Sequence, residues 1–181
     1  MSNSSLVTTS QINLRWILQR DLPAMLQIEQ RPPAPQWTRQ EFRDVFQSAD
    51  TAGWVAEVAG KVVGFLVYRV TSQPDLLHAV AHREKELLWH SASANVARKP
   101  LGITVLSLAV AAPWRRRGIG RALIERLSQK LQYPRDSVRV TVPESNLAMQ
   151  LLLRSVGYRA RAVHRDYFGA EDGYLMERHI A

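Results

Sequence analysis

Residues 115–120 of this 181-residue chain read Arg-Arg-Arg-Gly-Ile-Gly. Three positively charged side chains therefore come directly before two closely spaced glycines. These residues follow an apolar run at 103–110 and precede residues whose apolar positions recur at helical spacing. The free N–H groups of a helix N-terminus bind anions, and glycine lets a phosphate approach the backbone closely. Arginine adds charge and hydrogen-bond donors. We therefore predict a diphosphate site at this loop.

The same loop lacks two well-known nucleotide-binding patterns. A Walker loop needs Gly-Lys followed by Ser or Thr, and a dinucleotide fingerprint needs a third glycine. Neither pattern surrounds Gly118 and Gly120. The loop therefore argues against a kinase or a dehydrogenase. A basic loop before an ordinary glycine-initiated helix is the non-functional alternative.

The elements that must position this loop can be predicted along the chain. Strands are expected at 12–17, 54–58, 61–70, 103–110, 137–142, 158–167 and 174–178. Helices are expected to begin at Asp21, Thr38, Gly118 and Asn146. Thr38 with Glu41 three residues later forms a capping-box pattern, and Ala59-Gly60 joins two strands as a hairpin. This order predicts one α/β domain.

Composition limits the classes of protein that remain. The 46% of hydrophobic residues can form a core, and the absence of cysteine excludes disulfides and thiolate metal sites. Apolar runs are far shorter than the roughly 20 residues of a membrane helix, and the first eleven residues lack a signal-peptide layout. We expect a cytoplasmic protein with a flexible tail at 1–10 and a domain at 11–181, which contains an insertion at 73–100.

The net charge of +8 suggests an anionic partner. Nucleic acid, a ribosome and an anionic nucleotide cofactor are the possible kinds. Because the arginines are dispersed except at 115–117, we expect no specific nucleic-acid site. The histidines have no metal-binding spacing, so we expect no metal.

Segment 108–127, LAVAAPWRRRGIGRALIERL, resembles the acetyl-CoA-binding motif Q/R-x-x-G-x-G/A of the GNAT superfamily of acyl-CoA N-acyltransferases. Arg115, Gly118 and Gly120 occupy the motif positions. Segment 144–158 resembles the next motif of that superfamily, and the chain is similar to its peptide N-terminal acetyltransferases, including the ribosomal-protein-alanine type, at 28–42, 164–168 and 171–176. The resemblance covers most of 12–178 outside the insertion.

This resemblance implies a fold and a cofactor site. The fold would be a GNAT-like domain with a mixed, mostly antiparallel sheet of about seven strands, a splayed central strand pair and about four helices. Acetyl-CoA would be the co-substrate. Its pantetheine arm would pair with the backbone of Leu108, Ala109 and Val110. Its pyrophosphate would bind the backbone of Arg115, Arg116, Arg117, Gly118, Ile119, Gly120 and Arg121. Asn146 would bond the pantetheine amides or simply cap its helix.

The general acid and base are where the chain departs from its relatives. The usual glutamate falls on Thr141 and the usual tyrosine on Leu153, and neither side chain exchanges protons near neutral pH. We take Glu144 and Tyr167 as the candidate catalytic residues. The alternatives are an ordered water beside Thr141, the side chains of His164, Glu86 or His90, or binding with little turnover.

The amine that accepts the acetyl group is predicted to bind at the proline-rich segment 31–37 and at the strand residues 164–168. Trp37, Arg165 and Tyr167 are the candidate substrate-binding residues, although Trp37 could equally pack its helix onto the core. The expected reaction is direct attack of a primary amine, such as a protein N-terminus, on acetyl-CoA in a ternary complex. A small-molecule amine and a non-catalytic acyl-CoA-binding module are the alternatives. The sequence is compatible with either a monomer or a dimer.

Overall fold

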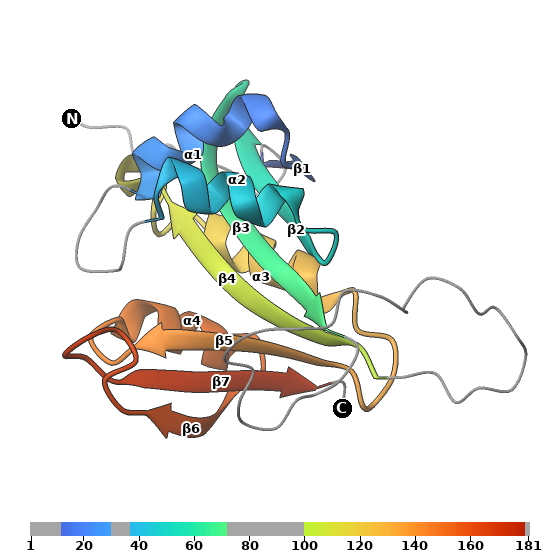
Figure 1. Ribbon diagram of the computed structural model, residues 1–181, viewed down its shortest axis with the longest axis vertical. Helices are drawn as coiled ribbons and strands as arrows, with labels where there is room; N and C mark the ends of the chain where they lie inside the picture. Colours follow the sequence, from blue (N-terminus) through green and yellow to red (C-terminus); the bar gives the residue numbers. More distant parts are fainter. Residues whose placement is uncertain (1–11, 30–36, 72–99, 180–181) are drawn as a thin grey trace, which may run out of the picture.

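The computed structural model describes residues 12–29, 37–71 and 100–179 (Figure 1). Several predictions lie outside these ranges. They are the tail at 1–10, nearly all of the insertion at 73–100 with Glu86 and His90, and the proline-rich residues before Trp37.

The described residues form seven strands, four α-helices and two short 3-10 helices. The strands are β1 (Asn13–Trp16), β2 (Thr51–Val58), β3 (Lys61–Thr71), β4 (Gly102–Val110), β5 (Ser137–Pro143), β6 (Arg159–His164) and β7 (Gly173–His179). The α-helices are α1 (Leu22–Glu29), α2 (Arg39–Gln47), α3 (Ile119–Ser128) and α4 (Leu147–Ser155). The 3-10 helices are η2 (Gln19–Asp21) and η3 (Ala112–Trp114).

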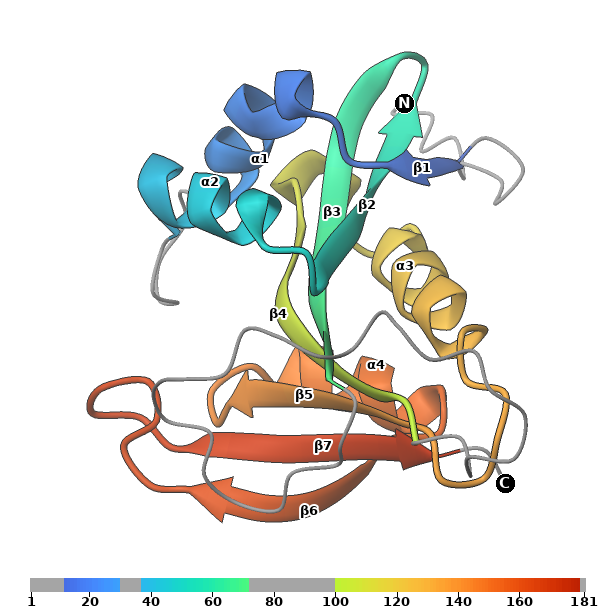
Figure 2. The same cartoon turned by 45° about the vertical axis from the view of Figure 1, so that its right-hand side comes forward.

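All seven strands belong to one sheet in the order β1-β2-β3-β4-β5-β7-β6. Every neighbouring pair is antiparallel except β4 and β5. Helices α1 and α2 cover one face of β2 and β3, and α3 covers the other (Figure 2). Helix α4 lies behind β5 and β7 in Figure 1. The predicted α/β class, the mostly antiparallel sheet and the four helices are confirmed.

The central parallel pair separates along its length. Strands β4 and β5 are paired only from Gly102↔Ser137 to Val105↔Val140. Beyond that point β4 stays paired with β3 as far as Val110, and β5 stays paired with β7 as far as Pro143. A β-bulge shifts the β3–β4 register beside Leu106, and bulges bend a strand and increase its twist. The predicted splay is therefore present, and it leaves one edge of the last five residues of β4 unpaired.

A buried carboxylate, that of Asp136, connects the beginnings of β4 and β5, where the two strands are paired. Asp136, fully buried, accepts hydrogen bonds from the backbone N–H groups of Leu101 (2.8 Å), Gln132 (3.0 Å) and Tyr133 (3.2 Å). The Ser137 amide also donates to the Leu101 carbonyl at 2.9 Å. These bonds fix the start of β4 against the start of β5, so the two strands can diverge only toward their carboxyl ends.

Local sequence patterns predict several turns and caps correctly. Thr38 Oγ1 accepts the Glu41 amide at 3.2 Å, and the Glu41 carboxylate accepts the Thr38 amide at 2.6 Å, which completes the capping box of α2. Ala59 and Gly60 have φ of 47° and 75°, as a tight hairpin between β2 and β3 requires.

Two local predictions are wrong. Asp21 does not cap α1 from outside, because its carboxylate binds the Leu18 amide at 2.8 Å and the Arg15 guanidinium at 2.7 Å, within a 3-10 helix that leads into α1. The strand expected at 158–167 ends at His164. Asp166 takes a φ of 51° and donates its amide to the Asp172 carboxylate at 3.1 Å, which turns the chain.

Candidate active site

The start of α3, where we predict a diphosphate site, has an uncapped N-terminus. Gly118 is the N-cap residue with a φ of 82°, a conformation that favours glycine, and no side chain caps this end. The first N–H groups of the helix are therefore left for another acceptor. Arg116 also has a positive φ, 62°, so the loop turns sharply before the helix.

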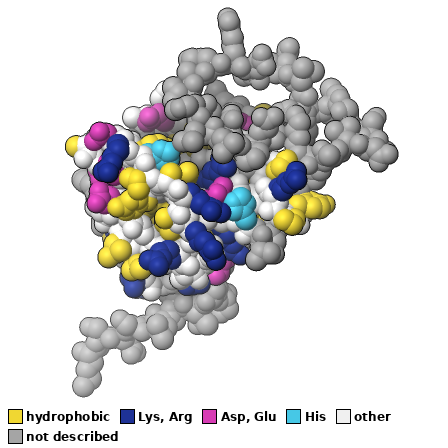
Figure 3. Space-filling model, turned by 90° about the horizontal axis from the view of Figure 1, so that it is seen from below, with side chains coloured by type: hydrophobic (Ala, Val, Ile, Leu, Met, Phe, Trp, Pro, Cys, Tyr) yellow, Lys and Arg dark blue, Asp and Glu magenta, His cyan; other side chains and the backbone are white. Residues whose placement is uncertain are grey.

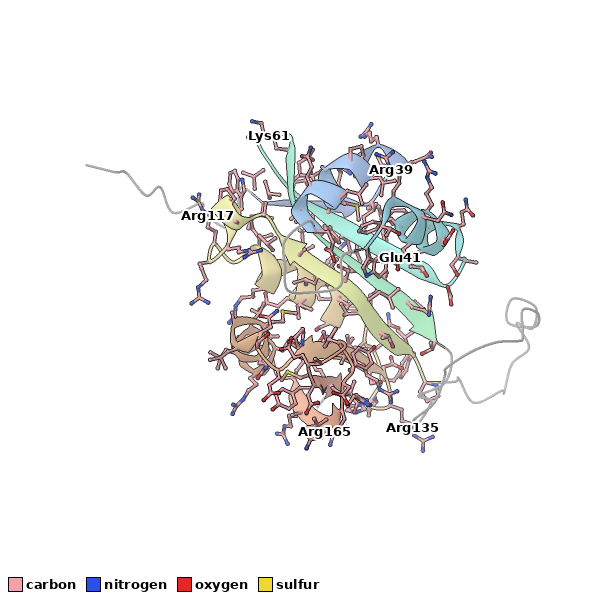
Figure 4. The ribbon with its side chains drawn as sticks, turned by 60° about the vertical axis from the view of Figure 1, so that its left-hand side comes forward. Arg39, Glu41, Lys61, Arg117, Arg135 and Arg165 are labelled. Carbon is pink, nitrogen blue, oxygen red and sulfur yellow. The ribbon has the colours of Figure 1, made fainter. Side chains whose placement is uncertain are left out.

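The arginines of this loop have different surroundings. Arg115 Nε donates to the Val110 carbonyl at 3.0 Å and so ties the loop to the end of β4. The Arg117 guanidinium lies over the Trp114 ring, 5.1 Å from its centroid, and its side chain points outward in Figure 4. Arg121 bonds Glu125 on α3 at 3.2 Å and Ser155 on α4 at 2.8 Å. Arg121 thus links the two helices that flank the loop.

A cavity of about 780 Å³ extends from this loop through the gap between β4 and β5 to the end of α1. Its volume falls within the range of small-molecule sites. All the predicted cofactor-binding residues except Arg117 line it. They are Leu108, Ala109, Val110, Arg115, Arg116, Gly118, Ile119, Gly120, Arg121 and Asn146. Segments that lie far apart in the sequence therefore meet at one cavity.

Gly120 and Asn146 both line this cavity where α3 and α4 approach each other. A Cβ on Gly120 would lie 3.3 Å from Leu152 Cδ2, closer than ordinary van der Waals contact. Asn146 Oδ1 accepts the Met149 amide at 3.1 Å and caps α4, while the Asn146 side chain also borders the cavity. Because the cap uses only the amide oxygen, the NH₂ group can still donate to a ligand.

The usual acid and base positions of the superfamily cannot carry protons here. Leu153 is fully buried within the core between α4 and the sheet. Thr141 sits on β5 opposite Leu175 of β7 and is half-buried. Neither residue lines the cavity. Neither side chain can therefore act as the general acid or base, and the identity of the groups that transfer protons stays a prediction.

The structure does not bring the predicted catalytic and acceptor residues to the cavity wall. Glu144 is exposed, although its neighbours Pro143 and Ser145 both line the cavity. Tyr167 is 56% exposed and contacts the His164 and Phe168 rings at 5.8 and 4.9 Å.

The other two acceptor candidates also make local contacts. The Arg165 side chain is 83% exposed and pairs with Asp172 at 2.6 Å. The Trp37 ring packs 5.0 Å from that of Phe42, against the cluster beneath α1 and α2. This position matches the packing role that the sequence left open for Trp37. Roles for these side chains in acceptor binding stay predictions.

Sequence reasoning missed one ionisable residue of the cavity. Glu29, the last residue of α1, lines it together with Ile28. The Ser107 hydroxyl of β4 donates to the Glu29 carboxylate at 3.3 Å, and burial raises the pKa of that carboxyl above its usual value. A sequence signal existed, because an acidic side chain at a helix C-terminus faces the negative end of the macrodipole.

The splayed sheet and the glycine-initiated helix after β4 agree with the class that the resemblance implies, an acyl-CoA-dependent acyltransferase. Residues 22–158, which are 137 of the 181 residues, match the acetyltransferase (GNAT) family. The chain belongs to this family. It is an N-acetyltransferase with acetyl-CoA as its co-substrate.

Individual relatives agree with this assignment. An N-alpha-acetyltransferase of Sulfurisphaera tokodaii is 28% identical over 141 residues, which cover 75% of this chain and 73% of that protein. The crystal structure of the ribosomal-protein-S18-alanine N-acetyltransferase of Escherichia coli has a TM-score of 0.71 and 24% identity, with 94% of each chain covered. Arabidopsis thaliana NAA60 in complex with acetyl-CoA has a TM-score of 0.72 and 20% identity, covering 93% of this chain and 98% of that one.

Two further observations concern the residues that the structure describes. Among them, no three or more His, Cys, Asp and Glu side chains are grouped as metal ligands. Within the same ranges, no helix has the length and apolar character needed to cross a membrane.

Proposed function

We propose that this protein transfers the acetyl group of acetyl-CoA to the α-amino group of a protein or peptide N-terminus. The observation that carries the proposal is the single cavity that is lined both by the arginine-glycine loop and by Ile28 and Glu29 at the end of α1. A cofactor bound at the loop would direct its thioester toward the α1 end, where an acceptor amine could enter. Acetyl-CoA and new protein N-termini meet in the cytoplasm, where we expect the protein to act.

The cofactor half of the proposal rests on the loop and on β4. The free N–H groups at the start of α3, with Arg115 and Arg116 beside them, suit the pyrophosphate. The unpaired edge of β4 near Leu108, Ala109 and Val110 can bond the pantetheine arm as another strand would. A backbone N–H near Val110 would stabilise the oxyanion that forms when the amine attacks the thioester carbonyl.

The acceptor half rests on the relatives and on the acidic end of the cavity. The relatives named above include an N-alpha-acetyltransferase and an enzyme that acetylates the alanine of ribosomal protein S18. Glu29 is the only acidic residue among the described residues that line the cavity, and its negative charge would attract an N-terminal ammonium. Glu144 and Tyr167, which lie outside the cavity wall, stay candidate catalytic residues.

A panel of acceptors tests the proposal. Thiol release from acetyl-CoA is measured with peptides that differ in their first residue and with polyamines and amino sugars. We expect turnover with free N-terminal peptides and none with the same peptides blocked at the N-terminus. Mass spectrometry should locate the added acetyl group on the α-amine. Turnover confined to the small amines would contradict the peptide acceptor while leaving the acetyltransferase activity intact.

A further inference from the structure

We propose that Glu29 is the proton acceptor of this enzyme, which takes the proton from the ammonium group of the acceptor before attack. The inference rests on the proposed function and assigns a residue to the step for which Thr141 and Leu153 are unsuitable. It uses no residue of the cofactor loop.

The position of Glu29 is the first argument. It is the last residue of α1 and lines the same cavity as Leu108, Ala109 and Val110 of β4. The hydroxyl that contacts it belongs to Ser107, the residue before Leu108 at the predicted pantetheine edge. The carboxylate therefore lies next to the segment of β4 where the thioester is expected. Helix α1, which carries it, lies on the opposite side of the sheet from α3 (Figure 2).

The unused hydrogen-bonding capacity of this carboxylate is the second argument. The Ser107 hydroxyl lies 3.5 Å from Oε1 and 3.3 Å from Oε2, so it is a weak donor to both oxygens. Within residues 12–29, 37–71 and 100–179, Glu29 has no ion pair and no other side-chain hydrogen bond. A carboxylate has about four acceptor positions, and an ammonium offers three donors. The free positions on Glu29 match the group that must be deprotonated.

The third argument is that the position of Glu29 disfavours the ionised form of its carboxylate. A carboxylate at the C-terminal end of a helix meets the negative end of the macrodipole, and partial burial removes some of its hydration. Both effects disfavour the charged form, and no cation in the described residues offsets them. Stability of the fold does not explain such a placement, whereas a base that must hold a proton reversibly needs a raised pKa.

Few ionisable groups surround Glu29 on the elements packed against α1. Glu29 is the only ionisable side chain of α1, and β4 has none. The charged residues of α2 are all exposed, namely Arg39, Glu41, Arg43 and Asp44. On β3 the ionisable side chains are Lys61 and Arg69 near the strand ends and the buried Tyr68. Arg20 and Asp21 belong to η2, which precedes the first residue of α1, whereas Glu29 is its last. Burial is therefore the main cause of the raised pKa of the Glu29 carboxyl.

The proton balance of the reaction is complete with this residue. The acceptor ammonium gives one proton to the Glu29 carboxylate, and the neutral amine attacks the thioester carbonyl carbon. A C–N bond forms and the tetrahedral intermediate collapses with cleavage of the C–S bond. The second proton of the nitrogen goes to the departing thiolate, giving the amide and free CoA. Glu29 then releases its proton to water, so no other reactant is needed.

The pH dependence of Glu29→Gln tests the inference. Glutamine keeps the shape of the side chain but cannot take a proton. We expect kcat/KM of the full-length variant with a substrate peptide to fall by about 10²-fold at pH 7. The loss should shrink by about tenfold at pH 9.5, because an α-amine with a pKa near 8 is then neutral without a base. Acetyl-CoA affinity, measured by titration calorimetry, should stay within about twofold of the wild type.

Matched variants separate this role from a structural one. Glu29→Asp retains a carboxylate and should keep the pH profile of the wild type with a reduced rate. Asp44→Asn, an exposed carboxylate on α2, should match the wild type at every pH. A loss for Glu29→Gln that is equal at pH 7 and 9.5, or no loss at all, would overturn the role of Glu29.

The proposal of a peptide acceptor can be wrong while the proposal for Glu29 is correct. If the wild type acts only on small amines, the peptide acceptor is wrong, and the same comparison with the active amine still decides the role of Glu29. A wild-type protein that acetylates no amine would overturn both proposals.

Discussion

Glycine at position 120 shows how one side chain can control the cofactor site. Its missing Cβ leaves space where Leu108, Val110 and Leu152 approach α3, and these three residues also line the cavity. A larger residue here would project into the space between α3, α4 and β4. The phosphate site that we predict on the adjacent loop would need that space to stay open.

Gly120→Val should therefore abolish measurable acetyl-CoA binding, with a loss of at least about 10²-fold in affinity because packed side chains do not yield without strain. Titration calorimetry gives the affinity, and circular dichroism shows whether the fold is retained. Ala122→Val is the control, since it adds a β-branched side chain to the same helix away from the cavity. Normal binding by Gly120→Val would refute the location of the cofactor.

Asp21 shows how a single ion pair affects stability. The carboxylate is buried, and its hydrogen bond with the Arg15 guanidinium lowers the pKa of Asp21 below its ordinary value of 3.8. A group with a depressed folded pKa stabilises the protein above its unfolded pKa, and the stabilisation disappears as the pH falls through the folded value.

Asp21→Asn should lower the free energy of unfolding at pH 7 by about 2 kcal/mol. In acid, below the ordinary pKa of 3.8, the variant and the wild type should become closer in stability, since the stabilisation falls as Asp21 takes up a proton. Thermal unfolding at pH 7 and in acid measures the difference, with the exposed Asp44→Asn as control. A stability gap that does not change with pH would show that the ion pair is unimportant.

At the scale of the element, α2 depends on its capping box. The helix has nine residues, too few to be stable alone, and its reciprocal Thr38–Glu41 bonds satisfy free N–H groups at its start. Its apolar side, with Phe42 fully buried, then covers Phe65 of β3. The cap and the buried ring thus fix the helix that packs beside α1.

Thr38→Ala should destabilise the protein by about 1 kcal/mol, the usual cost of losing an N-cap. Urea unfolding measures this change. Gln40→Ala, which removes an exposed hydrogen bond to Asp44 on the same helix, should cost less than about 0.5 kcal/mol. Equal effects of the two variants would show that the capping box does not limit the stability of α2.

At the scale of the whole molecule, the sheet is closed at one end of β4 and β5 and open at the other. The Asp136 carboxylate closes it, because it binds three backbone amides from two segments. Replacement of Asp136 by alanine would leave those buried donors without this partner, and unsatisfied buried donors are costly. The opening that forms the cavity therefore depends on a residue at the far end of the strands.

Asp136→Ala should reduce the free energy of unfolding by about 3 kcal/mol or more, through loss of several hydrogen bonds to a charged group. Chemical unfolding provides the measurement. Asp50→Ala is the comparison, since its ion pair with Arg69 is exposed on both sides and should contribute less than about 1 kcal/mol. A small effect of Asp136→Ala would mean that other contacts hold the strand pair together.

The positive charge of the molecule is spread and partly paired. Seen from below, arginine and lysine side chains alternate with apolar and acidic ones (Figure 3). On the C-terminal strands, Glu177 pairs with Arg139 at 2.8 Å and with Arg161 at 3.2 Å. The net charge of +8 thus does not map onto one basic surface there. The expectation of no specific nucleic-acid site stays a prediction.

The sequence by itself determined the features that arise from neighbours along the chain. The loop at 115–120, the Thr38–Glu41 cap and the Ala59-Gly60 turn each depend on a few adjacent residues. Such local interactions select a conformation directly from residue type. The resemblance of these motifs to a known family then indicated the fold and the cofactor.

Only the tertiary structure decided which side chains face the cavity. Glu29 and Ser107 are 78 positions apart, and their contact depends on how α1 packs against β4. Glu144 and Tyr167, chosen from sequence, do not line the cavity, and Tyr167 lies in the turn that follows β6 instead of in a strand. Long-range packing fixes these orientations, and a one-residue change of register or an earlier strand end reverses them. No pattern of neighbouring residues contains that information.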